Sequence, residues 1–507
     1  MNKIQKFIEE NKLLFGVFVL GILWEVFVFY RLPKQAWVEG LLEAWYTQKG
    51  LVFYRDFTNQ YPPFLHMLMV VFHKVFGFTQ TPSLLLAPLN SILVLVLLLW
   101  ASLKRLSGWF RILPLVFFLF WDPVLSQNHF STAAFHETVN FMAFILWFSW
   151  YKKPDRLTAF WIGLLSSASL FSMHISVGFV GFIFLSMLYR VFKNKKNFSA
   201  FVFASIAFLI PLVFIVLWFA WKNALYDLYW WNIAYYFSGR YPYASLGRGL
   251  TNTLTFGAVF GSAAFILRKI YLAFKNSGGK SKDSKELDKW GLLFLFLIVS
   301  SLPISIWFAI FHPVRFQIAL PIFAFVFGWG IQLMSNLNKE KKFVNFLLIL
   351  LVVVLNIGSF YFYMLPFYKR SFLYRQERNI LSKVYKDDPM YDAVKWIREN
   401  TSEDARLFVI ADPLFYLETQ RLPANPRGTM NQPFTYEPLD ELSAELSRKP
   451  PDYWVIDERL VNERFLQFGY PHTTLYFDKL LACEPEVAKI EYVTIREHNR
   501  NSKLCVD

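Results

Sequence analysis

The sequence has 507 residues, of which 55% are hydrophobic, 20% are aromatic and only 18% are charged. Ordinary soluble domains carry roughly 25% charged residues, so this composition excludes a purely soluble enzyme. The formal net charge is +15, and the two cysteines, Cys483 and Cys505, are too few for a disulfide scaffold and lack the paired spacing of a zinc site.

A helix that crosses a bilayer needs about 20 mainly apolar residues. The sequence contains about eleven such runs, near 13–32, 83–102, 109–126, 132–151, 157–174, 177–192, 199–220, 251–270, 291–310, 315–334 and 343–363. A shorter apolar stretch, Phe64 to Phe78, is interrupted by His66, His73 and Lys74. We expect this stretch to lie in the membrane interface rather than across the bilayer.

The basic residues predict the orientation of these helices. With the N-terminus inside, the cytoplasmic segments hold 23 Lys and Arg residues against seven acids, a net charge of +16, and all other segments sum to −1. This asymmetry follows the positive-inside rule and places everything after about Phe367 outside. The excess charge therefore indicates topology and not nucleic-acid binding. The first run is too long for a signal peptide, so we interpret it as a signal anchor of a multipass inner-membrane protein.

The tail from residue 368 to 507 has a different pattern from the transmembrane part, residues 1–367. Charged residues become frequent, and segments typical of helices alternate with apolar runs typical of strands. The expected helices are Met390 to Asn400 and Pro438 to Lys449, and the expected strands are Leu407 to Ala411, Tyr453 to Asp457 and Val487 to Ile495. We predict a small extracytoplasmic α/β domain, without the Gly-rich signature of nucleotide binding.

Acidic and basic side chains concentrate in the segments expected outside. The first outer loop, residues 33–82, contains Glu39, Glu43 and the run Tyr54-Arg55-Asp56-Phe57 before Gln60-Tyr61-Pro62-Pro63. The outer loop from Trp221 to Leu250 and the shorter outer turns add the remaining polar candidates: Lys222, Asp227, Arg240, Arg248, Asp122, His136, Glu137, His174, His312 and Arg315. Glu25 lies within the first helix, where an acid usually faces the bundle interior.

Carboxylates and cations on one face suit the transfer of an activated group from a lipid carrier. A carboxylate can take the proton of an acceptor hydroxyl, and cations can neutralise a departing phosphate. The residues show no spacing typical of a metal site, so we expect neither a metal nor another cofactor.

The first outer loop resembles that of the integral-membrane GT-C glycosyltransferases, in the branch of protein O-mannosyltransferases and lipid A aminoarabinose transferases. The residues that carry the resemblance are Glu39-Gly40, Tyr54-Arg55-Asp56-Phe57 and Tyr61-Pro62-Pro63, supported by His312-Pro313-Val314-Arg315 and Leu320-Pro321. The likeness extends over most of the chain. The expected α/β tail supports the resemblance. We therefore expect the α-helical polytopic membrane protein predicted above, with about eleven transmembrane helices, to be of the GT-C type.

The same resemblance implies inverting transfer of a sugar from a polyprenyl-phosphate donor, with an acid of the first loop as base. Family members often have an Asp-Glu pair where this chain has Val38-Glu39, so the base is either Glu39 or Asp56. Expected substrate-binding residues are Tyr54, Arg55, Gln60, His174, Lys222, Arg240, His312 and Arg315. The acceptor would be a lipid, a glycan or a protein, and the alternative function is a non-enzymatic transporter or flippase of lipid-linked saccharides.

Overall fold

The computed structural model describes residues 9, 11–31, 38–57, 61–126, 130–237, 317–337, 350, 389–425, 439–458 and 482–499. The chain forms two compact units. Unit 1 comprises Met1–Ala36, Ser83–Phe214 and Tyr243–Glu377, and unit 2 comprises Trp37–Pro82, Ile215–Pro242 and Arg378–Asp507. Unit 2 thus groups segments of both long outer loops with the tail. The boundary expected between residues 367 and 368 stays a prediction.

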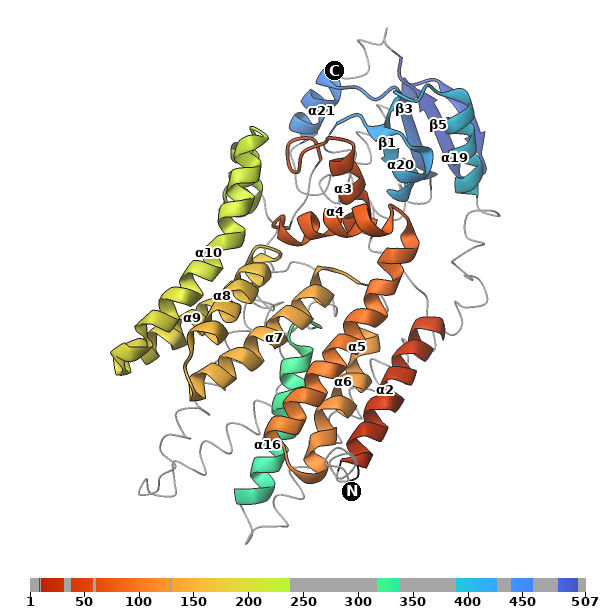
Figure 1. The fold of residues 1–507 in the computed structure, drawn as a ribbon. Coiled ribbons are helices and arrows are strands. Elements are labelled where there is room, and N and C mark those ends of the chain that lie inside the picture. Colours follow the sequence, from red (N-terminus) through yellow and green to blue (C-terminus); the bar gives the residue numbers. More distant parts are fainter. Residues whose placement is uncertain are drawn as a thin grey trace. The chain divides into compact units, whose positions relative to one another are not determined.

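Unit 1 is helical, and its helices form at the predicted apolar runs (Figure 1). Its described helices are α2 (Lys12–Arg31), α5 (Gln80–Arg105, which begins in unit 2), α6 (Leu113–Ser126), α7 (Thr132–Lys152), α8 (Arg156–Leu170), α9 (Val177–Lys193), α10 (Phe198–Trp221, which ends in unit 2) and α16 (Leu320–Leu337), with short 3-10 turns at Gly108–Ile112, His174–Ser176 and Lys195–Asn197. Apart from Leu350, the runs near 251–270, 291–310 and 343–363 lie outside the described residues.

Four segments in the described part of the chain are long and apolar enough to cross a membrane: Lys12–Tyr30, Gln80–Arg105, His174–Lys193 and Lys195–Trp221. This confirms a membrane protein, while the total of eleven spans stays a prediction. The stretch expected in the interface forms α4 (Phe64–Phe76), a helix too short to span the bilayer.

Side-chain caps and close backbone approach fix the helices of unit 1. Ser131 caps α7 by accepting a hydrogen bond from the amide of Ala133, and Asp155 caps α8 by accepting one from Thr158. Helices α8 and α10 meet at Gly163, where an added Cβ would overlap the backbone of Ala204. Small residues allow this kind of close helix contact in membranes.

Replacing Gly163 by Ala should therefore destabilise unit 1, because α8 must move away from α10. We expect a loss of about 1–3 kcal/mol, typical of overpacking, seen as a lower midpoint of thermal unfolding of the purified protein. Gly181→Ala is the matched control, since a Cβ on Gly181 meets no atom within 4 Å. Equal midpoints for the two variants would contradict the close packing of α8 on α10.

Unit 2 combines helices of the outer loops with a mixed sheet. The loop helices are α3 (Val38–Gln48), α4, α11 (Leu225–Tyr229) and α12 (Tyr235–Phe237), and a π-helical turn, Trp230–Ala234, joins the last two. The tail contributes α19 (Pro389–Asn400), β1 (Arg406–Ile410), α20 (Leu414–Thr419), β2 (Leu422–Pro423), α21 (Leu439–Arg448), β3 (Tyr453–Asp457), β4 (Glu486–Ile490) and β5 (Val493–Glu497).

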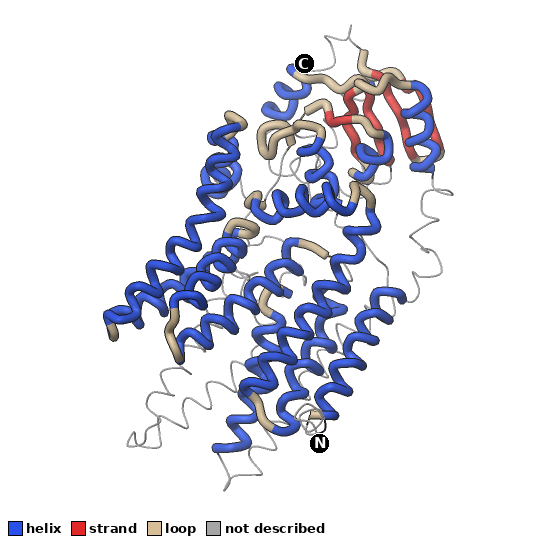
Figure 2. Tube along the Cα trace, viewed as in Figure 1, coloured by secondary structure: helices blue, strands red, loops and turns tan. Residues whose placement is uncertain are grey.

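The five strands, drawn red in Figure 2, belong to one sheet. Their order in it is β2-β1-β3-β5-β4. Strands β1, β2 and β3 are parallel, and β5 is antiparallel to both β3 and β4. The sequence predicted β1 and β3 because nearly continuous apolar runs mark buried strands. The single strand expected over Val487 to Ile495 was wrong: Glu491 has φ +50° and turns the chain, so this run forms the β4–β5 hairpin.

Candidate functional site

The run Phe53 to Phe57 forms a tight turn in unit 2. The Phe53 and Phe57 side chains are fully buried, with ring centres 4.7 Å apart, and the amide of Tyr54 donates to the carbonyl of Phe57 at 2.8 Å. Tyr54 has φ +66°, in the left-handed region that non-glycine residues rarely occupy. Such backbone strain persists only where surrounding contacts impose it, and it concentrates at functional sites.

Contacts of Tyr54 hold the turn in this conformation. Its ring stacks on Phe219 with 5.6 Å between centres, and its hydroxyl donates to the carbonyl of Tyr61 at 2.6 Å. The Tyr54 side chain is buried, and burial raises the pKa of its hydroxyl. Tyr54 therefore anchors the turn to α10 and to the chain ahead of α4, and its expected contact with substrate stays a prediction.

The side chains of Asp56 and Arg55, in the same turn, form an ion pair that is partly exposed to solvent. Arg55 donates to Asp56 through Nη2 at 2.8 Å and Nε at 3.2 Å, and the amide of Val52 donates to Asp56 Oδ2 at 2.8 Å. A third donor, Arg55 Nη1, reaches the carbonyl of Lys222 at 2.9 Å. The Arg55 side chain is 42% exposed and that of Asp56 is 22% exposed, so both reach solvent from a fixed position.

The charges of this group affect one another. The hydrogen bond to Asp56 raises the pKa of Arg55, so this side chain is always a cation. Asp227 on α11 is close enough to interact with both: its partial burial and the charge of Asp56 raise the pKa of Asp227, whereas Arg55 lowers it. Two acids and one cation thus share this part of unit 2.

The second candidate base, Glu39, lies in the first turn of α3 and is half-buried. One helical turn later, Glu43 is buried, and its carboxylate faces Nδ1 of the buried His66 on α4. The rings of Phe53 and Tyr61 flank His66, with centres 6.0 Å and 6.4 Å from it. Sequence reasoning missed this pair, because it treated Glu43 as an exposed neighbour of Glu39 and His66 as an interruption of an apolar run.

Lys222 joins the site through its backbone. Its carbonyl fixes Arg55, while its ammonium lies 4.1 Å from the centre of the Trp221 ring. His174 is half-buried at the start of a 3-10 turn in unit 1, and the turn with Asp56 belongs to unit 2. The other expected substrate-binding residues lie outside the described part of the chain: Gln60, Arg240, His312 and Arg315.

Unit 1 buries a second group of acids. Glu25 on α2, Asp122 on α6 and Glu137 on α7 interact electrostatically. Asp122 accepts from the Ser91 hydroxyl at 2.9 Å, and Glu137 accepts from the Gln317 amide at 2.9 Å. Glu25 faces the bundle interior, as the sequence predicted. Asp122 and Glu137 were assigned to outer turns, but they are buried within helices.

His136, another of the polar candidates, is buried on α7. Both ring nitrogens of His136 face carbonyl oxygens, of Thr132 at 2.6 Å and Ser169 at 2.7 Å, so this side chain joins α7 to the end of α8.

Cys483, just before β4, is disulfide-bonded, and the other cysteine of the sequence, Cys505, lies outside the described residues. Among the described residues, no group of three His, Cys, Asp or Glu side chains could hold a metal ion.

Comparison of structures finds known proteins similar to this chain, whereas comparison of sequences finds none. No protein-family model matches the chain, and no curated protein matches its sequence. Its structure is similar to ArnT from Cupriavidus metallidurans bound to undecaprenyl phosphate, with a TM-score of 0.57 and 11% identity, over 97% of this chain and 99% of ArnT. ArnT is a GT-C glycosyltransferase. The chain has the GT-C fold.

A second GT-C glycosyltransferase gives the same result. The oligosaccharyltransferase from Archaeoglobus fulgidus, tethered with an acceptor peptide, has a TM-score of 0.54 and 12% identity over 93% of this chain and 72% of its own. The structure of the oligosaccharyltransferase AglB from the same organism, with an inhibitory peptide and a dolichol-phosphate, has a TM-score of 0.50 over 90% of this chain. The resemblance seen in the first outer loop is thus confirmed at the level of the fold.

Proposed function

We propose that this protein is a glycosyltransferase that moves a sugar from a polyprenyl-phosphate-linked donor to a hydroxyl acceptor at the outer face of the plasma membrane. The observation that carries the proposal is the structural similarity to ArnT, which covers nearly all of both chains. The ArnT structure has undecaprenyl phosphate bound. A fold alone does not define a reaction. The exposed Asp56–Arg55 pair supplies the chemical groups that this reaction needs.

In the proposed reaction, the acceptor hydroxyl oxygen bonds to the anomeric carbon while the bond from that carbon to the phosphate oxygen breaks. The lipid phosphate leaves with the bonding electrons, and the anomeric configuration inverts. Asp56 would take the hydroxyl proton. Within the described residues, its Oδ2 accepts two hydrogen bonds and its Oδ1 accepts one, so Oδ1 can accept a further hydrogen bond from the acceptor hydroxyl. Glu39 is the second candidate for this role.

The departing phosphate needs a nearby cation. Arg55 uses three of its five N–H groups in the described contacts, so two remain to bind phosphate oxygens. A cation stabilises the transition state more than the bound donor, because negative charge on the leaving oxygen grows as the glycosidic bond breaks. No nucleotide, metal or other cofactor has a role in this scheme.

The decisive test is an assay of the purified protein with a panel of radiolabelled polyprenyl-phosphate sugars. The proposal expects label to move from at least one donor to an acceptor, with release of polyprenyl phosphate. The alternative is a transporter or flippase of lipid-linked saccharides, and the buried acids Glu25, Asp122 and Glu137 are of the kind found in transport paths. A chemically unchanged donor that crosses the bilayer of proteoliposomes would support the alternative.

The proposed orientation puts the N-terminus in the cytoplasm and unit 2 outside the cell. The charge asymmetry of the sequence supports it, and so does the disulfide at Cys483, because disulfides are rare in the reducing cytosol. A cysteine placed at Lys282, outside the described residues, should react only with reagents on the cytoplasmic side. One placed at Asp452, a partly exposed residue just before β3, should react only from outside. Labelling of both from one side would contradict this topology.

We also propose that Arg315, which the sequence places at the outer end of a membrane helix, helps to bind the lipid phosphate. Arg315→Ala should lower both turnover and donor affinity, measured as kcat and donor KM. Arg315→Lys should restore only part of the activity, since a guanidinium can hold two phosphate oxygens at once. Unchanged kinetics in Arg315→Ala would leave Arg55 and the residues of the Trp221 to Leu250 loop as the phosphate-binding candidates.

A further inference from the structure

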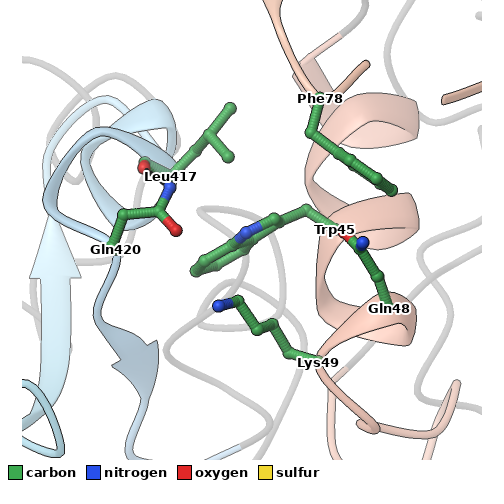
Figure 3. Close-up of a pocket in the computed structure, with 6 residues that line it drawn as sticks. All are labelled: Trp45, Gln48, Lys49, Phe78, Leu417 and Gln420. Carbon is green, nitrogen blue, oxygen red and sulfur yellow. Dashed lines mark hydrogen bonds between the residues drawn. The ribbon is translucent and has the colours of Figure 1, made fainter. Parts of the chain in front are cut away.

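Unit 2 contains a pocket of about 400 Å³ between α3 and α20 (Figure 3). Its six lining residues are Trp45, Gln48, Lys49, Phe78, Leu417 and Gln420. Trp45 and Leu417 are buried and give the pocket an apolar floor, whereas Gln48, Lys49 and Gln420 are exposed and form a polar rim. The volume lies in the range of sites for small ligands, about 300–1,000 Å³.

The polar atoms of the rim define what the pocket can bind. Lys49 lies just after α3 and holds its ammonium 5.8 Å from the centre of the Trp45 ring. Figure 3 shows the side chains of Trp45 and Lys49 extending toward Leu417 and Gln420. Gln420 donates its amide N–H to the carbonyl of Leu417 at 2.7 Å, which leaves the amide oxygen directed at Trp45. None of the six residues is acidic, so the one formal charge is positive.

This chemistry selects a ligand with three features. The half-buried Phe78 ring and the apolar floor suit the apolar part of a ligand, and the exposed carboxamides of Gln48 and Gln420 suit hydroxyl groups. An anionic group suits Lys49. A sugar unit that carries a carboxylate combines all three, whereas a lipid tail would leave the rim unused and a nucleotide would bring more negative charge than one lysine matches.

The pocket and the Asp56 turn share the helix α3. The Tyr46 ring contacts Trp45 on one side and Phe57 on the other, each at 5.4 Å between centres, and contacts Tyr416 of α20 at 6.1 Å. The same aromatic contacts therefore fix both walls of the pocket and the base of the turn. The buried Tyr46 ring is thus a structural element that the pocket and the turn share.

We propose that this pocket binds an acidic sugar unit of the acceptor, so that the acceptor is an anionic glycan. This inference rests on the proposed glycosyltransferase function, because it names the acceptor class for that reaction. It adds a recognition site that is separate from the reacting atoms, with Lys49 as the residue that determines charge specificity.

The test compares two disaccharides that differ by one group, cellobiouronic acid and cellobiose, on the full-length protein in nanodiscs. Isothermal titration calorimetry should show the acid binding about tenfold more tightly than the neutral sugar, as expected for one charge-assisted hydrogen bond. Lys49→Met should remove the preference and Lys49→Arg should keep it. Lys74→Met is the matched control, since Lys74 is exposed on α4 of the same unit and does not line the pocket.

Several outcomes would overturn the inference: no binding of either sugar, equal binding of both, or the same loss in Lys49→Met and Lys74→Met. Displacement of the acid by an equal concentration of acetate would show that the site reads charge alone, and it would overturn the saccharide assignment. Binding needs no turnover, so a negative result here leaves the proposed transferase standing. If no donor of the panel supports transfer, the proposed function is rejected, whereas the calorimetric result on sugar binding remains valid.

Discussion

Replacing Asp56 by Asn should lower turnover by about 100-fold to 10,000-fold, the range expected for loss of a general base. Asn keeps the shape of the side chain and an oxygen that can accept the hydrogen bond from the amide of Val52, but it cannot accept the proton of an acceptor hydroxyl. The loss should fall on kcat more than on donor KM, because the proton moves only as the transition state forms. Single-turnover assays with a labelled donor measure it directly.

Two comparisons make this result specific. Asp392→Asn applies the same change to an exposed carboxylate on α19 and should leave turnover unchanged. Glu39→Gln tests the second candidate base, and the larger of the two losses identifies the base. Near-normal turnover in both Asp56→Asn and Glu39→Gln, in protein whose thermal unfolding is unaltered, would remove the first outer loop from the list of catalytic segments.

Replacing Glu43 by Gln should destabilise unit 2 by about 1–3 kcal/mol, the cost of taking the carboxylate partner away from a buried polar group. His66 is fully buried on α4, and Glu43 is the carboxylate that pairs with it from α3. Loss of this pair should loosen α3 on α4 and also the Phe53–Phe57 turn, because Phe53 contacts His66. The midpoint of thermal unfolding of the purified protein measures the effect.

The controls for Glu43 separate the polar pairing with His66 from simple packing. Gln48→Ala lies on the exposed side of the same helix and should change the midpoint little. The double variant Glu43→Leu with His66→Leu should be more stable than Glu43→Gln, since replacing both partners by apolar residues leaves no uncompensated polar group. A double variant as unstable as the single one would show that the two side chains act through packing and not through their pairing.

Local pattern alone predicted much of this protein. Apolar runs of about 20 residues form helices wherever the structure describes them, because backbone polar groups in a bilayer must be satisfied within the segment. Strands β1 and β3 form within one residue of their predicted positions, since both are continuous apolar runs between polar segments. The run Tyr54-Arg55-Asp56-Phe57 indicated the GT-C fold, which the structural comparison confirmed.

Tertiary structure decided the features that depend on distant partners. Strand β2, helix α20 and the β4–β5 hairpin are short, and neighbouring strands and helices, more than local periodicity, specify them. Arg55 is fixed by the carbonyl of Lys222, 167 residues away in the sequence, and His66 is buried because α4 packs on α3 and places Glu43 beside it. The sequence determined which polar residues the outer loops carry, but only long-range packing determined that Asp56 and Arg55 reach solvent while Tyr54, Glu43 and His66 do not.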